Sequence, residues 1–249
     1  MINQGKEFES ELCKALNKKK ISSLNQNLQH FIRHLFPEAN FHQRISCVLT
    51  DNYVKPDIVI TWKRRIARVS VKTGQASTLH GEDIKPFILF LRSIGVSTET
   101  QKTILYYQFG DGTLDGSGEK RMNYHEVYNW LEDRITKANK ELNDRFDVIE
   151  KVVERVVFQG VDPTADPADY VYYGDLDYGV VISRKQIMSH IKKKSWHYFD
   201  NLHIGPILLK AHARYAERQI VSDARRRKIT CYWSHFAEDM AYIDKRYTF

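Results

Sequence analysis

The pattern of apolar and polar positions predicts two adjacent strands within the first hundred residues. Residues 55–62 (KPDIVITW) and 67–75 (ARVSVKTGQ) carry the β-branched and aromatic side chains that favour strands. The basic residues between them, 63–65, are too polar to be anything but a connection. We therefore expect an antiparallel hairpin that brings Asp57 and Lys72 side by side at one end.

Helical periodicity surrounds this hairpin. Residues 5–17, 21–36 and 82–94 each repeat apolar positions at the spacing of one helix face. Pro37 ends the second of these helices and Gly95 the third. Residues 41–49 and the run 103–109 (TILYYQF) are typical of strands, so we expect a parallel crossover from the hairpin through helix 82–94 to strand 103–109.

A loop rich in glycine and acidic residues, 110–121, is the clearest predicted boundary. It divides the chain into a core, 1–110, and a second region, 123–249. In the second region, residues 123–158 read as one long helix or two shorter ones. We expect strands at 170–173, 178–182, 202–210 and 229–233, and helices at 183–194 and from 234 onwards. The predicted class is α/β (α+β), with a central mixed sheet flanked by helices and a C-terminal α+β extension.

The composition of the chain limits the kinds of partner and location that we expect for it. The 249 residues carry a net charge of +7, which favours a polyanionic partner such as DNA. Cys13, Cys47 and Cys231 are too far apart for a zinc ribbon or a disulfide framework. The chain shows no signal core and no apolar run long enough to span a bilayer, so we expect a cytoplasmic protein without membrane contact.

The basic residues gather late in the chain. Interleaved with tyrosine and tryptophan, they suit phosphate contacts and base stacking. The alternative is an exposed charged turn between elements. The residues expected to bind nucleic acid are Lys192, Lys193, Arg214, Arg218, Arg225, Arg226, Arg227 and Lys228.

Pro56-Asp57, followed by a strand ending in Ser70-Val71-Lys72, resembles the PD-(D/E)xK nuclease superfamily, which includes restriction endonucleases and junction resolvases. The resemblance covers residues 1–110 and implies a restriction-endonuclease-like core. One position departs from the family pattern, because Ser70 stands where an acidic residue is usual.

The resemblance implies a site for Mg²⁺ or Mn²⁺ held by Asp57 and the backbone carbonyl of Val71, with Lys72 orienting the nucleophile. Glu9, or Glu82 or Asp83, would replace the acid missing at Ser70, and Gln75 is a weaker neutral donor. Glu9 follows an aromatic residue, as in the first helix of many of these nucleases. Its alternative role is a solvated acid favoured by the helix dipole.

Two functions follow from these patterns. The first is a metal-dependent endonuclease that hydrolyses phosphodiester bonds in DNA, in restriction or phage defence, with the second region recognising DNA or forming a homodimer. The alternative is a catalytically silent nuclease-like module that binds nucleic acid or forms part of a complex. A carboxylate from Glu9, Glu82 or Asp83 within metal reach of Asp57 would favour the first function.

Overall fold

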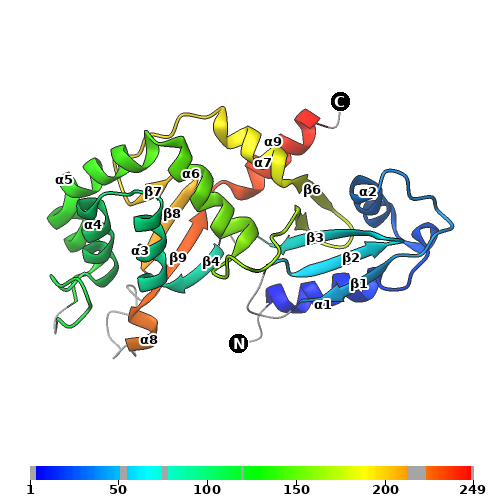
Figure 1. Ribbon diagram of the computed structural model, residues 1–249, viewed down its shortest axis with the longest axis horizontal. Coiled ribbons are helices and arrows are strands. Elements are labelled where there is room, and N and C mark those ends of the chain that lie inside the picture. The colour runs from blue at the N-terminus through cyan, green and yellow to red at the C-terminus, as the bar shows by residue number, and fades with distance from the viewer. Residues whose placement is uncertain (1–3, 51–54, 75–77, 119–120, 212–222, 248–249) are drawn as a thin grey trace. The chain divides into compact units, whose positions relative to one another are not determined.

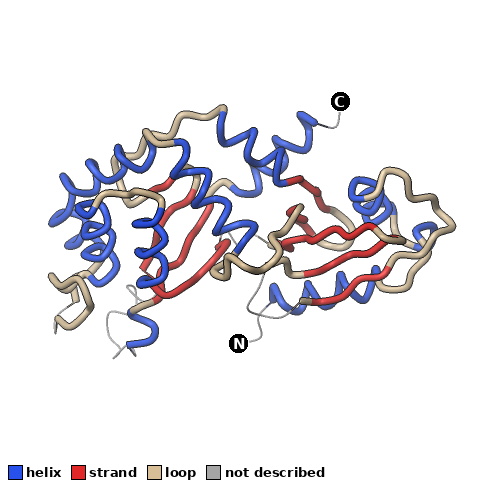
Figure 2. Tube along the Cα trace, viewed as in Figure 1, coloured by secondary structure: helices blue, strands red, loops and turns tan. Residues whose placement is uncertain are grey.

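The computed structural model describes residues 4–50, 55–74, 78–118, 121–211 and 223–247 (Figure 1). The chain forms two compact units, each assembled from separate segments. The first unit comprises residues 1–76, 157–190 and 235–249, and the second comprises 77–156 and 191–234. Each unit has its own sheet, and Figure 2 shows the strands of both. The fold is therefore α+β, with one mixed and one antiparallel sheet.

The sheet of the first unit has five strands in the order β1-β2-β3-β5-β6. The pairs β1–β2, β2–β3 and β5–β6 are antiparallel, whereas β3 and β5 run parallel. The connection between these parallel strands contains most of the second unit. The strand bounds are β1 Ser46–Leu49, β2 Ile58–Trp62, β3 Arg65–Lys72, β5 Tyr170–Gly174 and β6 Gly179–Ser183.

The hairpin predicted from residues 55–75 is confirmed by β2 and β3. Its register pairs Ile58 with Val69 and Trp62 with Arg65, so Lys63 and Arg64 make a two-residue turn. Lys63 adopts a positive φ of 53°, the left-handed conformation that such tight turns need. The alternate residues Ala67, Val69 and Val71 are buried on one face of β3, as the period of a strand requires.

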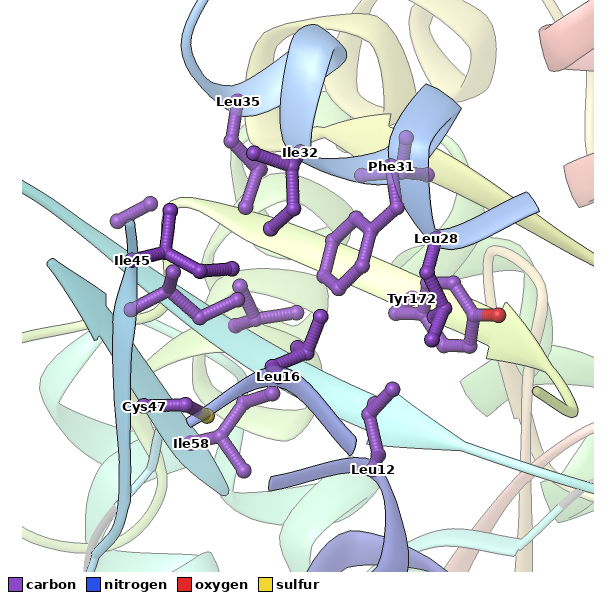
Figure 3. Packing of buried hydrophobic residues seen from close by; sticks show 14 of the residues in the cluster. Leu12, Leu16, Leu28, Phe31, Ile32, Leu35, Ile45, Cys47, Ile58 and Tyr172 are labelled. Atoms are coloured by element: carbon purple, nitrogen blue, oxygen red, sulfur yellow. The ribbon is translucent and has the colours of Figure 1, made fainter. Parts of the chain in front are cut away.

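Helices α1 (Gln4–Leu16) and α2 (Gln26–Leu35) supply the apolar side chains that cover this face. Figure 3 shows side chains from both helices converging on Ile58 and Tyr172 of the sheet. A 3-10 turn, Ile21–Ser23, precedes α2, and the Asn25 side chain caps α2 by accepting a 2.8 Å hydrogen bond from Leu28 N. Helix α7 (Arg184–Lys192) follows β6, and α9 (Phe236–Tyr247) is the last of the described helices.

The second unit is built around an antiparallel sheet in the order β4-β9-β8-β7. Its strands are β4 Thr78–Asp83, β7 His203–Ile204, β8 Ile207–Ala211 and β9 Lys228–Trp233. The long helical pattern at 123–158 forms two helices and a π-helical segment. The helical elements of this unit are α3 Ile84–Ser93, α4 Thr98–Phe109, α5 Tyr124–Asn143, α6 Phe146–Val153, α8 Asp223–Arg226 and the π segment Glu154–Gln159, which continues past the unit boundary.

The prediction of a strand at 103–109 is wrong, since these residues form the second half of α4. The crossover expected to end there instead ends at β5. The residues that follow the hairpin, Thr78–Asp83, form β4. β4 pairs with β9, which lies about 150 residues later in the sequence, so local patterns do not reveal it.

The two units also differ from the expected regions 1–110 and 123–249. Hydrogen bonds and an ion pair hold the loop at 110–118 within the second unit. Asp111 accepts hydrogen bonds from Thr113 and Gly118 of the loop and pairs with Arg226 at 2.8 Å. The loop is therefore part of a packed structure, although its composition is typical of a linker. None of the helices in the described residues has the length and apolar character needed to cross a bilayer.

Candidate active site

The end of the β2–β3 hairpin brings together four residues of the predicted site, Asp57, Ser70, Val71 and Lys72. Asp57 directly precedes β2, and its backbone N–H donates to Val69 O at 3.0 Å. Continuing the register of the hairpin places Ser70 opposite Asp57, with Lys72 two residues further along the same face. The hairpin therefore juxtaposes Asp57 and Lys72 diagonally.

The Asp57 carboxylate is held by donors from β3. Its Oδ2 accepts hydrogen bonds from Ser70 Oγ at 3.0 Å and from Val71 N at 2.6 Å. Lys72 Nζ lies 3.6 Å from the same oxygen and donates to the Val71 carbonyl at 3.0 Å. All the hydrogen bonds that described residues make to this carboxylate reach Oδ2, and none of them reaches Oδ1.

Charge keeps Asp57 ionised although its side chain is only 18% exposed. Burial alone would raise the pKa of this carboxyl. The ammonium groups of Lys72 and Lys55 and the two hydrogen bonds outweigh burial, so the pKa lies below its usual value. Lys55 is itself buried, and its Nζ donates to Val157 O at 3.4 Å.

Glu9 belongs to the same electrostatic cluster. It follows Phe8 of α1, whose side chain is buried in the core of the first unit. Burial first, and the negative charge of Asp57 second, raise the pKa of Glu9 to about 7, while Lys72, Lys6 and Lys55 act in the opposite direction. Glu9 thus lies close enough to Asp57 and Lys72 for their charges to influence its proton.

Ser70 is fully buried, and its hydroxyl donates to Asp57. It therefore stabilises the ionised carboxylate from the position where the superfamily pattern has an acid. A serine hydroxyl is a weaker ligand for a divalent cation than a carboxylate. A divalent cation at Asp57 would need a second negative ligand from another element, and Glu9 is the acid found in this cluster.

Glu82 lies in the second unit, at β4, where both carboxylate oxygens are engaged. Arg155 Nε and a terminal guanidinium nitrogen bind them at 2.9 and 2.7 Å, and His80 Nε2 lies 3.3 Å from Oε1. Burial would raise the pKa of Glu82, but His80 and Arg155 outweigh it and lower the pKa. Its neighbour Asp83 pairs with Lys228 at 3.2 Å. Gln75, the neutral candidate, lies outside the described residues.

The ligands for a metal are therefore few. In the described ranges, no group of three or more histidine, cysteine, aspartate or glutamate side chains is arranged to hold a metal ion. At the hairpin end, the candidate donors are the carboxylates of Asp57 and Glu9 and the carbonyl oxygen of Val71. This donor set suits a cation that takes most of its other ligands from water and phosphate, as Mg²⁺ does.

The predicted nucleic-acid-binding residues separate into exposed and engaged side chains. Lys192, Lys193, Arg225 and Arg227 are exposed. Lys228 is also exposed but pairs with Asp83, whereas Arg226 is bound to the fully buried carboxylate of Asp111. Arg214 and Arg218 lie outside the described residues.

Sequence reasoning missed Lys55. Its position immediately before Pro56-Asp57 was the available signal, but a lysine next to a turn is usually solvated.

Comparisons of the chain with protein-family models, with curated proteins and with solved structures gave no match.

Proposed function

We propose that this protein is a metal-dependent endonuclease that hydrolyses phosphodiester bonds in DNA. The observation that carries the proposal is the cluster at the hairpin end, where an ionised Asp57 lies 3.6 Å from Lys72 and shares an electrostatic environment with Glu9. Two carboxylates and an ammonium around one strand end suit phosphoryl chemistry on a metal ion.

The strand arrangement supports a restriction-endonuclease-like core. Helices α1 and α2 precede the antiparallel strands β1–β3, which is the helix, helix, strand, strand, strand order that the resemblance implies. The second unit would then be a large insertion between β3 and β5, with its basic residues available to bind the duplex.

The donors of this chain fit a hard divalent cation. Asp57 Oδ1, the Glu9 carboxylate and the Val71 carbonyl are all oxygen ligands, which Mg²⁺ and Mn²⁺ prefer. The raised pKa of Glu9 supports this assignment, because a cation between Glu9 and Asp57 would offset the repulsion that contributes to the shift. When bound, the cation would activate water and offset charge on the phosphate.

Each side chain of the site would then have its own role. Asp57 and Glu9 would hold the cation, and Lys72 would orient the attacking water or stabilise negative charge on the phosphate. Ser70 and Val71 N would fix the Asp57 carboxylate in one orientation. Lys55 would help to keep Asp57 ionised. Restriction or phage defence is the setting in which we place this activity.

A second candidate is a silent nuclease-like module that binds nucleic acid or joins a complex. The observation that favours it is Ser70, whose hydroxyl satisfies Asp57 from the position of the missing acid. If Glu9 served only as a helix acid, Asp57 would remain the single carboxylate at the hairpin end among the described residues.

Plasmid cleavage in the presence of Mg²⁺ or Mn²⁺ tests the proposal. Wild-type protein should cut, whereas Asp57→Ala and Lys72→Ala should each lose at least about 100-fold in rate. Lys63→Ala, in the exposed turn of the same hairpin, is the matched control and should cut normally. Absence of cutting on duplex, single-stranded and modified DNA and on RNA, with salt-sensitive binding retained, would favour the silent module.

A further inference from the structure

A small pocket in the second unit combines lysines with aromatic rings. Its volume is about 360 Å³, and it lies between the start of α6 and the residues that follow α7. Its lining includes Phe146 and Trp196, Lys192 and Lys194, together with Asp144 and His197. All of these residues belong to the second unit, and none takes part in the cluster around Asp57.

The ammonium groups in this pocket lie near the aromatic rings. Lys192 Nζ is 5.8 Å from the ring centroid of Phe146, and Lys194 Nζ is 5.4 Å from that of Trp196. Both distances are within the range of cation–π attraction. The lysines are exposed, whereas both rings are half-buried. Positive charge is therefore presented beside two aromatic rings that are partly accessible.

Hydrogen bonds to the last turn of α7 shape the pocket. The carbonyl of Ile191 accepts from Lys194 N at 3.3 Å and from Trp196 Nε1 at 3.4 Å. These two bonds turn the chain back at the end of the helix and fix the indole orientation. The Trp196 ring is therefore held in place before any ligand arrives, which lowers the entropic cost of binding.

This combination fits a nucleotide better than a simple anion. Aromatic rings stack on nucleobases, and lysines attract the phosphate that follows each base. The volume lies at the small end of ligand pockets, which suits one nucleotide and excludes a base pair. Asp144 disfavours a bare phosphate and can accept a hydrogen bond from an amino group of a base.

We propose that this pocket binds one unpaired nucleotide of a nucleic-acid strand, with the base stacked on Trp196 and its phosphate held by Lys192 and Lys194. A paired base is enclosed in the duplex and cannot reach such a pocket. The inference rests on the proposed function for the kind of polymer bound, and it extends the substrate to DNA with a single-stranded part, an end or an extruded base.

Lys193 provides an internal control. It is exposed and lies between the two pocket lysines in sequence, yet it does not line the pocket. If DNA were attracted only by a basic surface, all three lysines would contribute similarly to the binding affinity. If the nucleotide binds in the pocket, only Lys192 and Lys194 contribute to the binding affinity.

The test is fluorescence anisotropy of a labelled single-stranded oligodeoxynucleotide, without divalent metal and in an Asp57→Asn background. Lys192→Ala combined with Lys194→Ala, and separately Trp196→Ala, should each weaken binding about tenfold or more. Lys193→Ala should change it less than about twofold, and Trp196→Phe should retain most of the affinity because it keeps a ring. A duplex of the same sequence should be affected less by all pocket variants.

Three results would overturn the proposal. They are wild-type affinity in the double-lysine variant or in a folded Trp196→Ala variant, competition by inorganic phosphate as strong as by a mononucleotide, and no binding of single strands at all. The double-lysine variant alters exposed side chains, so its result stands even if Trp196→Ala fails to fold. Metal-dependent cutting by the parent protein is scored separately, so a failed nuclease with an intact pocket is distinguishable from a working nuclease without one.

Discussion

At the scale of single residues, the acidic pair of Glu9 and Asp57 dominates the site. The two carboxyls are driven in opposite directions by the same surroundings. Lysines and hydrogen bonds overcome burial at Asp57, whereas burial and the charge of Asp57 raise the pKa of Glu9 to about 7. One acid is thus ionised and the other titrates near neutral pH, so a cation bound between them would favour loss of the Glu9 proton.

Glu9→Gln should stabilise the protein at alkaline pH. Because the pKa of Glu9 is about 7 when folded and 4.5 in its reference state, the folded chain binds more protons between these values, and stability falls as pH rises through this window. For a half-buried group the gain above about pH 7 is on the order of 1 kcal/mol, or about 2–4 °C in Tm. Below about pH 4.5 the gain should vanish.

Thermal melts of wild type and Glu9→Gln across pH measure this gain. Glu7→Gln, an exposed position in the same helix, is the control and should show no such pH dependence. A gain from Glu9→Gln that is equal at both ends of the pH range would contradict the shifted pKa.

Ser70→Asp should make stability depend on metal. The new carboxylate would face Asp57, so without a divalent cation the two charges repel and the protein loses on the order of 2 kcal/mol. Adding Mg²⁺ should recover most of this loss. Ser70→Asn has nearly the same shape without the charge, and its Tm should not respond to Mg²⁺ more than that of wild type. Equal responses to Mg²⁺ in the two variants, read by thermal melts with EDTA or Mg²⁺, would argue against a cation at this position.

At the scale of elements, the local pattern identified the hairpin but misjudged α4. Residues 103–109 are rich in types that favour strands, yet tertiary contacts make them helical. Ser97 caps α4 at Thr100 N, and Glu141 of α5 accepts hydrogen bonds from the backbone and side chain of Ser97 and from the Thr100 hydroxyl. Gly110, with a φ of 63°, ends the helix. The cap residue was readable from the sequence, but the partner on α5 was not.

The site could be predicted where its residues share one hairpin. Asp57, Ser70, Val71 and Lys72 meet because antiparallel pairing is local, and that geometry follows from the sequence pattern. The environments of Lys55 and Glu82 depend on Val157 and Arg155, which are distant in sequence. Charge partners of this kind cannot be inferred from the spacing of residues along the chain.

Breaking the Arg155–Glu82 pair should destabilise the second unit. Arg155→Met would leave a buried carboxylate, with side-chain exposure of 3%, without its main counter-charge, at a cost of about 3 kcal/mol. Urea unfolding of this variant, compared with Arg155→Lys, measures the cost. Glu82→Gln should also destabilise, but it should leave Mg²⁺ affinity unchanged if Glu82 is structural. A loss of Mg²⁺ binding in Glu82→Gln would restore Glu82 as a metal ligand.

At the scale of the whole molecule, two interleaved units share one basic chain. Each unit takes segments from distant parts of the sequence, so the glycine-rich loop at 110–118 was a misleading guide to their limits. The net charge of +7 favours a polyanionic partner, but it does not say which basic residues would contact such a partner. In the structure, exposure separates basic side chains that can reach a partner from those, such as Arg226, that make internal contacts.

Arg226 and Arg227 should therefore behave differently. Arg226→Ala removes the partner of the buried Asp111 and should cost about 3 kcal/mol of folding free energy. Arg227 is exposed, so Arg227→Ala should leave Tm unchanged. If Arg227 contacts a DNA phosphate, its loss should reduce the salt slope of duplex binding by about 0.9. Urea unfolding checks the predicted loss of stability, and binding titrations at several salt concentrations check the predicted salt slope. An Arg226→Ala variant as stable as wild type would contradict the structural role of Arg226.

The most direct test of the central claim is the Mg²⁺ dependence of plasmid cleavage in Glu9→Gln, Glu82→Gln and Asp57→Asn. We predict that Asp57→Asn abolishes cutting, Glu9→Gln raises the Mg²⁺ requirement about tenfold or more, and Glu82→Gln leaves it unchanged where the variant remains folded. Metal-dependent cutting by Asp57→Asn at the wild-type rate would contradict the account, because the active site would then lie away from the hairpin.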